Sequence, residues 1–253
     1  MTASASAAEV LLHAAGSLRA ALTEISEAYE KASGNKVRGT YGASGTLRDQ
    51  IAAGERAEVF ASANMAHPQS LAKSGKSGPV VLFARNRLCA LVRPGLTVTP
   101  ATLLDQMLNA SVKVGTSTPK ADPSGDYAFE VFAKAESLKP GAKAALEAKA
   151  LKLSGAPDSA RPPEGRNLYG WNVVEGRADI YLCYCTAASV AQRENPGQQI
   201  VALPEALAVG ADYGLTVMNG ASPASYHFAL FMLSDAGQRI LSSHGFSAPL
   251  LAQ

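Results

Sequence analysis

Short apolar stretches of strand length alternate along the chain with segments in which apolar residues recur at helical spacing. Leu18, Leu22, Ile25 and Tyr29 are spaced so that they share one face of a helix. Predicted strands lie at 9–14, 36–41, 59–61, 80–83, 87–92, 112–115 and 179–184, and predicted helices begin near 18, 47, 123, 139, 170, 223 and 237. This alternation is typical of an α/β fold with mostly parallel strands.

Length and composition restrict the class of protein. A chain of 253 residues suits one large domain or two compact lobes. The proportions of hydrophobic residues (47%) and charged residues (17%) are those of a globular protein. The longest apolar runs, 80–84 and 228–233, are far shorter than the roughly 20 residues of a membrane-spanning helix. Lys and Arg (23) barely outnumber Asp and Glu (21), so we expect no nucleic-acid partner.

The chain has three cysteines, Cys89, Cys183 and Cys185. They are too few and too unevenly spaced for a disulfide framework or a four-ligand zinc site. Cys183 and Cys185 would share one face of a strand, but residues two apart in an extended chain lie too far from each other to bridge. We therefore expect buried free thiols, with no metal site and no cofactor.

The N-terminal residues 1–8 are small and polar and lack the basic start and apolar core of a signal peptide. Either the protein is cytoplasmic, or this is a mature form with an initiator Met added. The Ala- and Ser-rich run at 3–8 resembles the surroundings of a signal-peptidase cleavage site. This similarity favours a periplasmic protein from which the signal peptide has been removed.

Three times a predicted strand leads through small residues into a helix, with a hydroxyl at the turn: Ser17, Ser44 and Ser124. Such turns gather at the carboxyl ends of the strands in an α/β sheet, where ligands bind. The start of each helix offers unpaired backbone N–H groups and the positive end of the helix dipole. Together they predict a site for a small oxyanion. The alternative is that each serine simply caps its helix.

These turns and several later segments resemble the molybdate-binding periplasmic protein family. The segments that carry the resemblance are His13-Ala14-Ala15-Gly16-Ser17-Leu18, Tyr41-Gly42-Ala43-Ser44-Gly45-Thr46-Leu47, Ala57-Glu58-Val59-Phe60-Ala61-Ser62-Ala63, Pro123-Ser124-Gly125-Asp126-Tyr127-Ala128 and Val174-Glu175-Gly176-Arg177-Ala178-Asp179-Ile180 with Tyr184. Each motif is modest alone, but together they cover almost the whole chain in order.

The resemblance implies a type II periplasmic-binding-protein fold of class α/β. Each of two lobes would be a mixed, mostly parallel sheet flanked by helices, and a two-stranded hinge would join them. We expect lobe 1 to comprise 9–84 and 187–253, and lobe 2 to comprise 85–186. The implied protein is no enzyme. It is a periplasmic solute-binding protein, expected to be monomeric, that captures a tetrahedral oxyanion between its lobes and delivers it to the membrane permease of an ABC importer. Molybdate and tungstate are the first candidates for that anion.

The resemblance also implies a ligand-binding role for five residues. Ser17 and Ser44 would give hydroxyl and backbone N–H donors, Ser124 and Asn167 would give backbone N–H donors, and Tyr184 would donate its phenolic O–H. A fully deprotonated oxyanion only accepts hydrogen bonds. A pocket made only of donors would therefore reject a ligand that carries a proton of its own.

Two alternatives remain open from the sequence. If Arg166 points into the pocket, its guanidinium would suit a carboxylate or phosphorylated compound, and the chain would be a receptor of the same fold for a small organic anion. The stretch Gly42-Ala43-Ser44-Gly45 also resembles part of the nucleophile turn of a serine hydrolase. However, Thr46 replaces its second Gly, and none of the four histidines has a neighbourhood that suggests catalysis.

Overall fold

The computed structural model describes residues 8–249, and the chain forms two compact units. Unit 1 contains the chain up to Arg85 and from Asp212 onward, and unit 2 is Asn86–Ala211. The chain passes between the units within two strands, β4 (Val81–Val92) and β9 (Gly210–Val217). The first crossing lies between Arg85 and Asn86.

The second crossing differs from the predicted one. Residues 187–211 were expected in lobe 1, but they belong to unit 2. Strand β8 (Gln199–Ala202) pairs antiparallel with β4, from Cys89 to Val92. In addition, Ala188 and Ala191 of the preceding helix lie in the apolar core of unit 2. These contacts hold the segment in unit 2 until β9.

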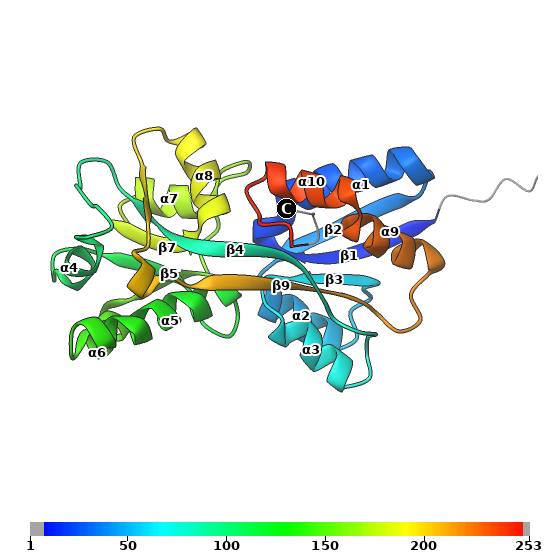
Figure 1. The fold of residues 1–253 in the computed structure, drawn as a ribbon, viewed down its shortest axis with the longest axis horizontal. Helices are drawn as coiled ribbons and strands as arrows, with labels where there is room; N and C mark the ends of the chain where they lie inside the picture. Colours follow the sequence, from blue (N-terminus) through cyan, green and yellow to red (C-terminus); the bar gives the residue numbers. More distant parts are fainter. Residues whose placement is uncertain (1–7, 250–253) are drawn as a thin grey trace, which may run out of the picture. The chain divides into compact units, whose positions relative to one another are not determined.

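Unit 1 is built on a sheet in which β1 pairs parallel with β2 and β3, while β3 pairs antiparallel with β9. Besides β9, the strands and helices of unit 1 are β1 (Glu9–Ala15), η1 (Gly16–Leu18), α1 (Arg19–Ser33), β2 (Lys36–Gly42), α2 (Ser44–Ala52), β3 (Val59–Ser62), α3 (Ala66–Lys73), α9 (Pro223–Leu233) and α10 (Asp235–Ser243). Helices α1, α9 and α10 lie on one side of this sheet, and α2 and α3 lie on the other (Figure 1).

Helix α1 shows how the apolar pattern fixes this packing. Leu22, Ile25 and Tyr29 are buried, as their spacing predicts. The helix ends at Gly34, whose φ of 75° is the left-handed conformation that glycine adopts most readily. The turn sends the chain back into β2, alongside β1.

Unit 2 combines parallel and antiparallel pairing: β5 pairs parallel with β6 and β7, and β7 pairs antiparallel with β4. Its remaining elements are α4 (Leu103–Leu108), β5 (Val114–Ser117), α5 (Pro123–Leu138), α6 (Ala142–Lys149), β6 (Leu151–Ser154), α7 (Leu168–Val174), β7 (Ile180–Tyr184), α8 (Cys185–Glu194) and η2 (Glu205–Leu207). Helices α5 and α6 cover one side of the sheet, and α7 and α8 cover the other (Figure 1).

Candidate anion-binding site

Ser17 and Ser44 lie at the same edge of the unit 1 sheet. Strands β1 and β2 run parallel, with Ala15 opposite Gly42, so the turns that follow them are neighbours. A Cβ atom added to Gly16 would lie 3.8 Å from the carbonyl oxygen of Gly42. The predicted meeting of these two turns at one sheet edge is therefore present in the structure.

The Ser17 hydroxyl has a partner that sequence reasoning missed. Its Oγ lies 3.0 Å from the phenolic oxygen of Tyr213, a fully buried residue on β9. Tyr213 packs edge-on against Phe83 and Phe246, which fixes its ring. No local pattern around Tyr213 points to Ser17, because only the pairing of β9 with β3 brings it to this side of the unit.

Ser44 is the first residue of α2 and is almost completely buried. Its Oγ accepts a hydrogen bond from the backbone N–H of Ala63, at 3.1 Å, just after β3. With that bond made, the proton of the Ser44 hydroxyl is still available for donation. No hydrogen bond found among residues 8–249 joins Ser44 to a histidine, and the hydroxyl is thus held by backbone rather than by a general base.

Ser124 and Tyr184 lie at one edge of the unit 2 sheet. Strands β5 and β7 run parallel, α5 follows the first after a short loop, and α8 follows the second directly. Tyr184 is buried, and its ring packs edge-on against Tyr127 with centroids 6.3 Å apart. Ser124 is fully buried, and its Oγ has no hydrogen-bond partner.

None of the three serines caps its helix, which was the alternative to a binding role. The N-cap residues are Ala15 before η1 and Ala43 before α2, neither of which gives a side-chain cap, and Asp122 before α5. Asp122 Oδ1 accepts the backbone N–H of Ser124 at 3.0 Å. Sequence reasoning missed Asp122, although an Asp before a Pro at a helix entrance is a recognisable capping signal.

The side chain and the backbone N–H of Asn167 both form hydrogen bonds within the protein. Its side chain caps α7 by accepting the N–H groups of Tyr169 and Gly170, and its own backbone N–H donates to the Glu194 carboxylate at 2.9 and 3.0 Å. Its Nδ2 donates to the carbonyl of Ala187 at 3.4 Å, which places it beside the first turns of α8. The backbone N–H predicted to meet a ligand thus has a carboxylate partner in this structure.

Arg166 pairs with the same carboxylate. Its Nε lies 3.5 Å from Glu194 Oε2, and its Nη2 donates to Asn195 Oδ1 at 3.3 Å. The guanidinium is therefore directed at the C-terminal end of α8. Among residues 8–249, no three His, Cys, Asp or Glu side chains cluster in a way that could hold a metal ion.

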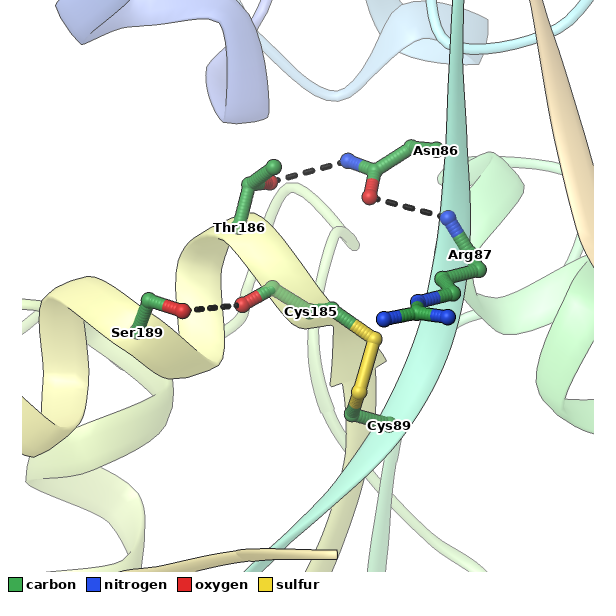
Figure 2. The surroundings of a disulfide bond; sticks show 6 residues. All are labelled: Asn86, Arg87, Cys89, Cys185, Thr186 and Ser189. Atoms are coloured by element: carbon green, nitrogen blue, oxygen red, sulfur yellow. Dashed lines mark hydrogen bonds between the residues drawn. A yellow bond between two sulfur atoms is a disulfide. The ribbon is translucent and has the colours of Figure 1, made fainter. Parts of the chain in front are cut away.

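The expectation of three free thiols is wrong. Cys89 on β4 and Cys185 at the start of α8 form a disulfide, with Cα atoms 4.9 Å apart (Figure 2). Only the antiparallel pairing of β4 with β7, which sets Leu88 opposite Tyr184, brings together two cysteines that are 96 residues apart. Cys183 is free and buried as expected, and burial raises the pKa of its thiol.

The disulfide lies beside a second link between the same two elements. Asn86 Nδ2 donates to Thr186 Oγ1 at 2.8 Å, while Asn86 Oδ1 accepts the backbone N–H of Arg87 (Figure 2). The first turn of α8 is thus tied to β4 by a covalent bond and a hydrogen bond. Both links adjoin Tyr184, so they fix the backbone of a predicted ligand-binding residue.

Two α/β units, each with strand-to-helix turns at the carboxyl ends of parallel strands, have the type II periplasmic-binding-protein fold, as the sequence predicts. The chain belongs to the family described as bacterial extracellular solute-binding protein, whose family model matches residues 10–247. This family binds solutes and is not a family of enzymes. None of the helices within residues 8–249 is long and apolar enough to cross a membrane.

Relatives in sequence support the predicted resemblance. An uncharacterized protein of Pasteurella multocida is 32% identical over 234 residues, which cover 92% of this chain and 96% of that protein. Molybdate-binding protein ModA of Mycobacterium tuberculosis is 27% identical over 263 residues, covering 96% and 86% of the two chains. The resemblance to molybdate-binding proteins is confirmed at the level of the family.

Solved structures share the fold at lower identity. The periplasmic molybdate-binding protein of Azotobacter vinelandii matches with a TM-score of 0.75 and 18% identity, covering 96% of this chain and 99% of that one. The sulfate-binding protein SubI of Mycobacterium tuberculosis matches with a TM-score of 0.76 and 18% identity, covering 96% and 87%. The binding protein AfuA of Actinobacillus pleuropneumoniae, with fructose-6-phosphate bound, matches with a TM-score of 0.68 and 13% identity, covering 97% and 89%.

Proposed function

We propose that this chain is a periplasmic receptor that captures a small tetrahedral oxyanion and delivers it to the membrane permease of an ABC importer. Molybdate and tungstate are the first ligands to test, because named relatives in sequence and structure bind molybdate. The receptor would act as a monomer. A disulfide near the candidate site is consistent with the periplasm, an oxidising compartment in which such bonds persist.

The observation that carries this proposal is the placement of donors at strand-to-helix turns in both units. Ser17 and Ser44 share a sheet edge in unit 1, and Ser124 and Tyr184 share one in unit 2. The first turns of α2 and α8 have no side-chain cap, so their backbone N–H groups and helix dipoles can serve an anion. Such a site needs no Lys or Arg.

The energetics of such a site are favourable. A hydrogen bond to a charged group contributes about 1.5–3 kcal/mol, so several donors can support tight binding after the costs of desolvation and ordering. The Ser44 hydroxyl is already oriented by the N–H of Ala63, which reduces the ordering cost on that side of the ligand. Hydroxyl and N–H donors suit an anion that has no proton of its own.

A small organic anion is the second candidate, and AfuA with its bound sugar phosphate supports it at the level of the fold. The guanidinium of Arg166 does not support this candidate, because it faces Glu194 and Asn195. If the ligand carries a carboxylate or phosphoryl group, we expect the same serine turns to bind that group.

Isothermal titration calorimetry tests the proposal directly. Molybdate and tungstate would be titrated into the purified chain, with sulfate, phosphate and citrate in parallel. Saturable binding of an oxyanion is the expected result. Ser44→Ala and Tyr184→Phe should each weaken it by about tenfold, the equivalent of one charge-assisted hydrogen bond.

Two variants that lose a hydroxyl outside the proposed site serve as matched controls. Ser70→Ala removes a hydroxyl that bonds only to a backbone carbonyl on α3, and Tyr226→Phe removes one from an exposed ring on α9. Both should bind like the parent chain. If none of the oxyanions gives a heat of binding, the proposed ligand class is refuted. If Ser44→Ala and Tyr184→Phe bind an oxyanion with the same affinity as the parent, the proposed site is refuted.

A further inference from the structure

The disulfide of unit 2 joins two cysteines with different surroundings. Cys89 is 4% exposed and lies in the apolar core of the unit, whereas Cys185 is only partly buried at the edge of that core. Cys185 is also the first residue of α8, whose first turn has no side-chain cap. It is therefore the member of the pair that solvent reaches more easily, and it lies at the positive end of a helix dipole.

A cationic side chain faces the same end of α8. Strands β4 and β7 are antiparallel, and one residue beyond the pair of Leu88 and Tyr184 lie Arg87 and Cys185. Arg87 projects from the same face of β4 as Cys89, and Figure 2 shows its guanidinium directed toward Cys185. Arg87 is exposed, and none of the ion pairs found within residues 8–249 includes it. A nearby cation and a helix N-terminus both favour the thiolate form of a cysteine.

The disulfide holds a turn on which the proposed site depends. Tyr184 directly precedes Cys185, and the uncapped backbone N–H groups of α8 follow it. The ladder between β4 and β7 ends at Leu88 and Tyr184, so it does not extend into this turn. Without the disulfide, the hydrogen bond from Asn86 to Thr186 would remain to tie the turn to β4. One such bond contributes little net free energy, so the turn would become mobile.

Reduction of this disulfide by a dithiol takes two steps. A thiolate of the dithiol attacks the Cys185 sulfur and forms a mixed disulfide, while the Cys89 sulfur leaves with the bonding electron pair and takes up a proton. The second thiol of the reductant loses its proton and attacks its own partner sulfur in the mixed disulfide. Cys185 is released as a thiolate, and the reductant closes an internal disulfide. The protein thus gains two electrons and the dithiol loses two.

We propose that Cys89–Cys185 is a thiol–disulfide exchange site that controls the anion site: a dithiol reduces it through Cys185, which loosens the first turn of α8 and lowers the affinity for the oxyanion. This inference rests on the proposed function and adds regulation to the same site. The disulfide acts on the ligand only by positioning Tyr184 and the N–H groups of α8.

Calorimetry on the full chain in its two redox states tests this control. One sample is reduced with dithiothreitol, freed of the reductant without air, and titrated with molybdate, tungstate and sulfate beside an oxidised sample. Reduction should weaken binding by about five- to tenfold, because the donors of a loosened turn must be ordered on binding. Cys183→Ala is the matched control and should keep this response, since it leaves the disulfide intact. Far-UV circular dichroism should be the same in both redox states.

A second experiment tests the exchange chemistry without any anion. Cys185 in Cys89→Ala should react with an aromatic disulfide reagent at least about tenfold faster than Cys89 in Cys185→Ala. Adding Arg87→Gln to Cys89→Ala should slow the reaction by about two- to fivefold, because it removes the cation that favours the thiolate. Arg193→Gln removes the same charge from the last turn of α8 and should leave the rate unchanged.

Each outcome has a distinct meaning. Equal oxyanion affinity in the oxidised and reduced chains would refute control of the site while the receptor stands. A loss of the far-UV signal on reduction would overturn the inference, because the disulfide would then act on the whole unit. If Cys185 reacts no faster than Cys89, exchange through Cys185 is refuted. If neither redox state binds any oxyanion, the proposed function fails and the control of affinity fails with it.

Discussion

The hydroxyl oxygens of Ser17 and Tyr213 lie 3.0 Å apart, although 196 residues separate them in sequence. Ser17 follows β1, and Tyr213 lies on β9 just after the chain re-enters unit 1. The bond orients a predicted ligand-binding hydroxyl by means of a buried ring. A hydroxyl whose direction is already set loses less entropy on binding than one that rotates freely.

Tyr213→Phe should therefore weaken oxyanion binding even though Tyr213 is only a positioning residue. We expect a loss of several-fold in affinity and of about 1 kcal/mol in unfolding free energy, as for one neutral hydrogen bond. A double-mutant cycle with Ser17→Ala, followed by calorimetry and denaturant unfolding, measures the coupling. Strictly additive losses would show that the two hydroxyls act independently.

The disulfide gives a prediction about stability. Reduction, or replacement of both Cys89 and Cys185 by Ala, should lower the unfolding free energy by about 2–4 kcal/mol, because the bond closes a long loop in the unfolded chain. Thermal unfolding with and without reductant measures this change. Cys183→Ala is the control and should keep the full response to reductant, and a thiol titration of the denatured, unreduced chain should find one thiol. Three free thiols would contradict the pairing.

Arg166→Ala should leave oxyanion affinity unchanged. The guanidinium is committed to Glu194 and Asn195, and the side chain is partly exposed to solvent, so we expect the unfolding free energy to fall by no more than about 1 kcal/mol. Calorimetry with the oxyanion and with citrate separates the two proposed ligand classes. Selective loss of citrate binding in Arg166→Ala would instead favour the organic-anion receptor.

We predict that His67 on α3 makes the protein less stable in mild acid. Burial and then the Arg48 charge lower its pKa from 6.5 to about 4, an effect that Asp49 only partly opposes. Between these two values the unfolded chain binds a proton that the folded chain does not. The unfolding free energy should therefore fall as the pH drops from about 6.5 toward 4, by on the order of 1–2 kcal/mol after allowance for solvent screening.

Denaturant unfolding at several pH values in this window measures the slope. His67→Gln should flatten it, because the side chain no longer titrates. His227→Gln, a change at an exposed position on α9, should keep the slope of the parent chain. If both variants lose stability in acid as steeply as the parent, His67 is not its source.

Local pattern determined much of the fold. The helical face of Leu22, Ile25 and Tyr29 and the apolar strands β1, β3 and β7 are present where the sequence predicts them. Other elements were missed or divided. The predicted strands at 80–83 and 87–92 are one strand, β4, and β6, β8 and β9 were not anticipated. A strand as short as β8, with four residues, carries little apolar signal in the sequence, so its pairing with β4 decides whether it forms.

The site residues, like the strands and helices, were predicted only where a local sequence pattern marks them. A strand that runs into small residues and then a helix is a local signal, and it sufficed to select Ser17, Ser44 and Ser124 as turn residues and Tyr184 as the end of a strand. The sequence by itself thus determined the α/β class, the family and which turns are candidates for an anion.

Tertiary structure alone decided what each of those groups touches. The Tyr213 partner of Ser17, the Cys89–Cys185 disulfide and the Glu194 partner of Asn167 all join residues far apart in the chain. Periodicity and turn chemistry report on the backbone within a few residues. A hydrogen bond or a disulfide depends instead on sub-ångström distances set by the register of whole strands, and no local pattern encodes these distances.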